Sequence, residues 1–192
     1  MKHRIFIAIN LPENIKKELA KCQDKWPELP IRWTKLHNLH ITLEFLGYLS
    51  DQDLPEICNI VKRMALRHQP FSINLKRICY GPPKKMPPRM VWATGESSQE
   101  LNHLKSDLEK SLADSVSRTP EKRAYSPHVT LGRIKTWEWR RIEPEERPQV
   151  EEEINLSFEV NSIEVMESVL KKGGPEYAIL ESCEFTSSAL GE

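Results

Sequence analysis

The chain contains two closely similar stretches, NLHITLEFLG at residues 38–47 and SPHVTLGR at residues 126–133. Each stretch has a histidine, a threonine two positions later and then a leucine, with His40 and Thr42 in the first and His128 and Thr130 in the second. Both have the alternation of a β-strand, in which side chains two residues apart point to the same face. The sequence therefore predicts two strands that each present a histidine beside a threonine.

The segments around the two stretches repeat one order of elements. Residues 5–47 read as a buried strand, an amphipathic helix and the strand with His40, and residues 90–134 repeat strand, helix and the strand with His128. We expect two lobes related by a pseudo-twofold axis. Further alternating patterns, at residues 71–75, 154–160 and 177–185, complete an antiparallel α+β fold with its helices outside.

Length and composition narrow the class of protein. With 192 residues and 39% hydrophobic content, the chain fits a single domain over residues 1–192, built of two small lobes. Lys+Arg and Asp+Glu are equal at 28 each, so no net charge favours nucleic acid, and a polyanion site must come from local clustering. The apolar run at residues 5–9 is too short for a signal peptide or a membrane span, and we expect a cytoplasmic monomer with no membrane partner.

Paired histidines suit the cleavage of a phosphodiester, which needs a base for the incoming oxygen and an acid for the leaving oxygen. An imidazole has a pKa near 6.5, so one ring can be neutral while the other is protonated near neutral pH. The hydroxyls of Thr42 and Thr130 could donate hydrogen bonds to the non-bridging phosphate oxygens. These four groups are our candidate site, and the residues alone leave open whether His40 or His128 is the acid.

Several neighbouring residues are weaker candidates. Arg133 follows Gly132, where the strand can bend and aim the guanidinium at the phosphate, and a surface salt bridge is its alternative role. Phe45 could stack on a base if its strand bulges, although core packing is the favoured prediction. Other basic residues could lead an RNA backbone into the cleft or could be solvated surface charge, namely Arg32, Lys35, Lys84, Lys85 and Arg89.

Metal and disulfide chemistry are not predicted. His37 lies three positions before His40, and odd spacing on a strand would put the two on opposite faces. No third histidine, cysteine or carboxylate cluster lies close to either stretch, so we expect no metal and no other cofactor. The four cysteines are far apart and form no Cys-x-x-Cys. The charged, proline-interrupted segment 135–153 is predicted to be a solvated loop.

Four stretches carry a resemblance to a known family, namely RIFIAINLP, RWTKLHNLHITLEFLG, AYSPHVTLGR and GGPEY. Together they closely resemble the 2H phosphoesterase superfamily, specifically the RNA 2′,3′-cyclic phosphodiesterases, also called bacterial and archaeal 2′-5′ RNA ligases. The resemblance runs over residues 4–185, and segment 135–153 departs from the family by its length.

The resemblance implies a bilobal α+β fold with two antiparallel sheets lining a central cleft. It also implies metal-independent hydrolysis of RNA 2′,3′-cyclic phosphate ends to a 2′-phosphate, with His40 as the proton donor and His128 as the proton acceptor. The same site would serve reversible 2′-5′ RNA ligation. Two alternatives remain open at this point: a 2H enzyme acting on small cyclic phosphates or 2′-5′ oligoadenylate, and a non-catalytic module that binds RNA ends.

Overall fold

The computed structural model describes residues 1–113, 115, 125–172 and 174–186. Its elements follow one another as β1 (Lys2–Asn10), α1 (Glu13–Gln23), β2 (Ile31–Trp33), η1 (Leu36–Asn38), β3 (His40–Ser50), α2 (Leu54–Ala65), β4 (Phe71–Gly81), β5 (Met90–Gly95), α3 (Gln99–Leu112), β6 (His128–Ile134), α4 (Thr136–Arg140), η2 (Pro144–Glu146), β7 (Glu151–Val160), β8 (Ser162–Lys171) and β9 (Gly174–Glu184). Among these helices, none is long and apolar enough to cross a membrane.

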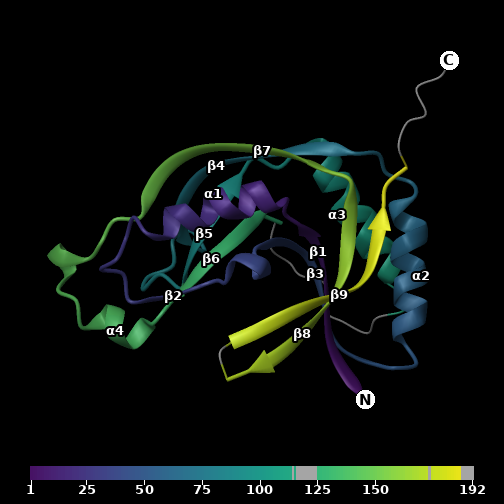
Figure 1. Cartoon of the computed structure of the whole chain (residues 1–192), viewed down its shortest axis with the longest axis horizontal. Helices are drawn as coiled ribbons and strands as arrows, with labels where there is room; N and C mark the ends of the chain where they lie inside the picture. The colour runs from purple at the N-terminus through teal and green to yellow at the C-terminus, as the bar shows by residue number, and fades with distance from the viewer. Residues whose placement is uncertain (114, 116–124, 173, 187–192) are drawn as a thin grey trace.

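Within the described residues, nine strands form one antiparallel sheet in the order β7-β4-β5-β6-β3-β1-β8-β9, with β2 paired to β6. The two halves of this sheet meet where Ile41 of β3 pairs with Val129 of β6. The predicted α+β fold with antiparallel strands is confirmed, and the two predicted sheets prove to be joined through this pair. Figure 1 shows β3 and β6 near the centre of the molecule.

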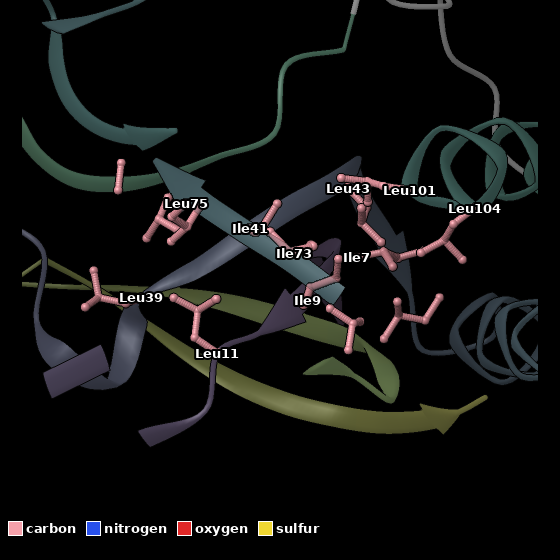
Figure 2. Packing of buried hydrophobic residues seen from close by; sticks show 14 of the residues in the cluster. Ile7, Ile9, Leu11, Leu39, Ile41, Leu43, Ile73, Leu75, Leu101 and Leu104 are labelled. Carbon is pink, nitrogen blue, oxygen red and sulfur yellow. The ribbon is translucent and has the colours of Figure 1, made fainter. Parts of the chain in front are cut away.

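The helices cover the face of the sheet that carries the alternating apolar residues of the strands. Figure 2 shows Leu101 and Leu104 of α3 packed beside Leu43 of β3 and Ile7 of β1, and all four are buried. Helix α1 contacts β6, while α3 contacts β3. Each repeat module thus places its helix on the motif strand of the other, which holds the two modules together.

The segment 135–153 was predicted as a solvated loop. Most of its residues are exposed, as predicted, but much of the segment is not a loop. It contains α4, the turn η2 and the first residues of β7. Trp139 of α4 is only 2% exposed and packs edge-on against Tyr80, with ring centroids 5.4 Å apart. The Tyr80 hydroxyl also donates to the carbonyl of Pro148 at 2.6 Å. The charged composition of the segment predicted a loop, although the buried side chain of Trp139 packs it against the core.

A buried ion pair joins α3 to β3. Lys105 of α3 donates to the carboxylate of Glu44, and both side chains are buried. Lys105 also donates to Glu109 at 2.6 Å and lies 5.7 Å from the centroid of the Tyr125 ring. A second-module helix is thereby tied to the strand that begins with His40.

Replacing Lys105 by methionine takes the ammonium group of this pair away from the buried Glu44 carboxylate. We expect Lys105→Met to lower the free energy of unfolding by about 3 kcal/mol, measured by urea denaturation. Lys110→Met, at an exposed position of the same helix, should change it by less than about 0.5 kcal/mol. Equal losses in the two variants would contradict the assigned role of Lys105.

Candidate active site

The two motif strands lie side by side and turn their polar residues to a common face. Ile41 and Val129 pair across the junction and are fully buried on the core side. Their neighbours along each strand therefore point to the opposite face of the sheet, and these neighbours are His40, Thr42, His128 and Thr130. Continuing the antiparallel register by one residue sets each histidine opposite the other motif's threonine. The two histidines are then diagonal neighbours, with Cα atoms about 7–8 Å apart.

Both imidazoles are held through the same ring nitrogen. Nδ1 of His40 lies 2.7 Å from the carbonyl oxygen of Asn38, and Nδ1 of His128 lies 2.8 Å from that of Ser126. Because a carbonyl oxygen can only accept, each Nδ1 carries the hydrogen, and Nε2 of the neutral ring is left as the proton acceptor. In His40 this Nε2 lies 3.0 Å from Oγ1 of Thr42. Nε2 is thus the atom that can exchange a proton in the cleft.

A β-bulge in β6 brings Arg133 to the same face as His128. Leu131 is an extra residue between the pairs that Thr130 and Gly132 make with β5. The bulge shifts the alternation by one residue, so the face of His128 and Thr130 is continued by Arg133, which is exposed. The predicted bend thus occurs one residue earlier than expected, as a bulge at Leu131.

The same bulge occurs in β3 and exposes Phe45. Leu43 is extra between the pairs that Thr42 and Glu44 make with β1, and the buried and exposed positions of β3 then follow those of β6. Phe45 occupies the place that Arg133 has in the other strand and is 64% exposed. The favoured prediction of core packing for Phe45 is wrong, because it did not include the bulge.

Aromatic rings surround His40. The ring of Phe6 lies 5.0 Å from the imidazole, and Tyr177 of β9 meets it edge-on at 5.1 Å. Burial raises the pKa of Tyr177, while the charges of Arg133 and Arg4 oppose this shift. Both guanidinium groups are therefore close enough to act on the phenol beside His40. Sequence reasoning missed Tyr177 because the place of β9 depends on its pairing with β8 and on contacts far apart in the sequence, such as the hydrogen bond from Asn38 to the carbonyl of Pro175.

The imidazole of His128 is stacked on a tryptophan. The Trp92 and His128 rings are 3.7 Å apart at an angle of 21°. Trp92 lies directly over Gly81 of β4, where an added Cβ would come within 2.1 Å of the indole. Glycine at position 81 thus makes room for the indole that orients His128. No local pattern in the sequence indicates this contact, since it depends on strand register.

The environment makes both histidines weak bases in the free protein. Burial lowers the pKa of His40 to about 4, with the charges of Lys16 and His128 adding to the effect and the hydrogen bond to Asn38 opposing it. Burial likewise lowers the pKa of His128. At neutral pH both rings are therefore mostly uncharged in the free protein.

Lys16 is a further charged group near the site that sequence reasoning missed. It lies near the start of α1, is 6% exposed, and makes no ion pair with any residue that the structure describes. Burial lowers the pKa of its ammonium group, although the charge of Glu13 opposes this. On an amphipathic helix, Lys16 looks like an ordinary surface residue, and only its burial shows otherwise.

Tyr125 connects the two motifs directly. Tyr125 directly precedes the second motif in the chain, and its hydroxyl donates to the backbone carbonyl of Thr42 in the first motif at 3.1 Å. The segment that leads into His128 is therefore fastened to the strand of His40.

The remaining predicted residues are spread around the site. Arg32 of β2 pairs with Arg133, and its guanidinium lies against Gly174, where an added Cβ would be 1.9 Å from Nη2. The charge of Lys35 helps to lower the pKa of the Glu176 carboxyl group in β9. Three more are exposed in the loop between β4 and β5, namely Lys84, Lys85 and Arg89. His37 is exposed on η1, and the described part of the chain holds no cluster of three or more metal-binding side chains.

Comparison with known proteins gives concordant matches. The family model described as LigT like Phosphoesterase matches twice, at residues 9–92 and 94–177. The RNA 2′,3′-cyclic phosphodiesterase of Methanocaldococcus jannaschii is 31% identical over 93% of this chain and 98% of its own length. That of Thermotoga maritima is 30% identical over 95% of each. A crystal structure of a Thermus thermophilus protein superposes with a TM-score of 0.82 at 27% identity, covering 94% of this chain and 97% of the other.

The influence of Lys16 on His40 can be measured in the free protein. Lys16→Met removes a positive charge that disfavours the imidazolium, so the pKa of His40 should rise. The pH titration of the His40 ring signals by NMR would record the change. Lys17→Met, at an exposed position one residue on, should leave the His40 pKa unchanged. An unchanged His40 pKa in Lys16→Met would show that the ammonium group does not reach the site.

Proposed function

The chain belongs to the LigT like Phosphoesterase family, and on that premise we propose that it hydrolyses RNA 2′,3′-cyclic phosphate ends to a 2′-phosphate. One observation carries the proposal. Two imidazoles lie on the same face of two paired strands, and each has Nδ1 bound to a backbone carbonyl, so that Nε2 is the nitrogen that can accept a proton. This arrangement suits an in-line displacement at phosphorus, in which an acid and a base stand on opposite sides of one phosphate.

In the proposed reaction, Nε2 of His128 accepts a proton from water as the water oxygen bonds to phosphorus. The bond between phosphorus and O3′ breaks, and Nε2 of protonated His40 gives its proton to O3′. The phosphate remains on O2′. One proton is taken up and one is given, so the histidine pair ends with the same number of protons in exchanged positions.

The other cleft residues act on the phosphate charge. Thr42 and Thr130 lie beside the histidines on the same face. The Thr130 hydroxyl can donate to a non-bridging oxygen, and the Thr42 hydroxyl, 3.0 Å from Nε2 of His40, can do so once that ring is protonated and no longer accepts its hydrogen. Arg133 lies on that face as well, and its guanidinium can stabilise the charge of the pentacoordinate transition state. These protein groups supply the acid, the base and the charge, so the proposed reaction uses no metal.

The difference between the two bulges supports the assignment of acid and base. Phe45 on the His40 side can take a base by stacking, while Arg133 on the His128 side can take phosphate charge. The nucleoside then lies on the side of His40, and O3′ with it. The same arrangement read in reverse, with an RNA 5′-hydroxyl in place of water, would give 2′-5′ ligation.

Removing either imidazole should abolish most of the activity. His40→Ala and His128→Ala are expected to lower turnover of an RNA oligonucleotide with a 2′,3′-cyclic phosphate end by at least about 10²-fold. The assay runs in excess EDTA, and unchanged thermal unfolding verifies the fold. His37→Ala removes an exposed histidine next to the first motif and should remain active. Wild-type-like turnover in both motif variants would remove these histidines from the mechanism.

The pH dependence should reflect a pair of weakly basic histidines. One proton must be shared between His40 and His128, so kcat/KM follows a bell. Because both pKa values are lowered in the free protein, the maximum of kcat/KM should lie below pH 6.5, with the rate falling as the pH rises further. A bound phosphate anion favours the imidazolium, so the kcat profile should lie at higher pH. A kcat/KM that climbs steadily to pH 9 would exclude a protonated histidine.

A further inference from the structure

We infer that Tyr48 and Arg4, on the face of β3 and β1 beyond Phe45, bind the nucleotide that precedes the cyclic end. The substrate is then an RNA strand rather than a free cyclic mononucleotide. This inference rests on the proposed function and adds a second nucleotide-binding position to the same site.

The cleft face continues past Phe45 without interruption. Phe45 pairs with Phe6, and Tyr48 pairs with Arg4, with a second register shift between these pairs that makes Leu46 an extra residue. Because of this second bulge, Tyr48 lies on the same face as Phe45. On β1 the partners Phe6 and Arg4 are two residues apart, so the two pairs are about 6.6 Å apart along the sheet.

The two rings form an open aromatic row. Phe45 is 64% and Tyr48 is 65% exposed, and the ring of Phe45 lies 6.0 Å from that of Phe6, which in turn contacts His40. Exposed aromatic side chains on neighbouring positions of an antiparallel sheet are the usual platform for unpaired bases. The row begins at the candidate acid and leads away from it.

A cation lies where the connecting phosphate would pass. Arg4 is exposed, makes no ion pair with any described residue, and acts through its charge on Tyr177 beside His40. On the sheet it is the register partner of Tyr48, so its side chain lies beside the second ring. A guanidinium beside the outer of two stacking positions suits the phosphodiester that joins two nucleotides.

The direction of this row agrees with the proposed chemistry. If His40 protonates O3′, the terminal ribose lies on its side of the cleft, and the preceding nucleotides must leave the site from that ribose. They then leave over β3 and β1, which Figure 1 shows running from the centre of the molecule toward the N-terminus. In the proposed reaction the water enters from the side of His128, and a water molecule has no base that would require an aromatic side chain for stacking.

The experiment compares two substrates with the same terminal nucleoside: adenosine 2′,3′-cyclic phosphate and a short oligoribonucleotide that ends in it. Tyr48→Ala should lower kcat/KM for the oligonucleotide about 5- to 150-fold, the effect of losing one stacked base, and leave the mononucleotide unchanged. Tyr48→Phe keeps the ring and should keep the rate. Arg4→Gln should weaken the oligonucleotide reaction and reduce its dependence on salt.

Trp137→Ala is the matched control, because Trp137 is 74% exposed on α4 and should affect neither substrate. Binding of a labelled oligonucleotide with a 2′-phosphate end, followed by fluorescence anisotropy, gives a readout without turnover. If the wild type hydrolyses neither substrate but Tyr48→Ala weakens oligonucleotide binding, the proposed function is wrong and the inferred RNA-binding role of Tyr48 is supported. The inference would be overturned if Tyr48→Ala affected both substrates equally or affected neither. A dimer that depends on Tyr48, detected by sedimentation, would overturn it as well.

Discussion

The pairing of Ile41 with Val129 is the contact on which the rest of the site depends. It is the point where two halves of an antiparallel sheet meet, and it sets two motif strands side by side with their apolar residues turned to the core. The histidine and the threonine of each motif then lie on the opposite face of the sheet. The helices that cross from one module to the other, the buried pair of Lys105 with Glu44 and the Tyr125 hydroxyl all hold this junction in register.

On this nearly symmetric scaffold, the two sides of the cleft differ in chemistry. Both motif strands bulge at the leucine after the threonine, and the bulge exposes Phe45 on one side and Arg133 on the other. The environments of the two imidazoles also differ, since His40 lies beside the tilted ring of Phe6 and the edge-on ring of Tyr177, whereas His128 is stacked on Trp92. The twofold match to the family model accounts for the two motif histidines. In the proposed function, the differences at single positions let the site bind a nucleotide in one orientation.

Much of this arrangement could be predicted from the sequence, because it rests on local periodicity. The alternation around His40 and His128 indicated the strands and the shared face of each histidine and threonine, and the repeated order of elements indicated that the motifs would meet. The bulges could not be predicted, since an extra residue is defined only against its partner strand. The same limit applies to Trp92 and Tyr177, which reach the histidines through register, and to Lys16, whose burial depends on how α1 packs.

The central claim is that a single phosphate is held between two imidazoles. A crystal structure of the protein with adenosine 2′-phosphate tests it most directly. The account predicts that oxygen atoms of the nucleotide product, O3′ among them, lie within about 3 Å of Nε2 of both His40 and His128. A phosphate bound outside the cleft, or one that touches only one of the two rings, would contradict it.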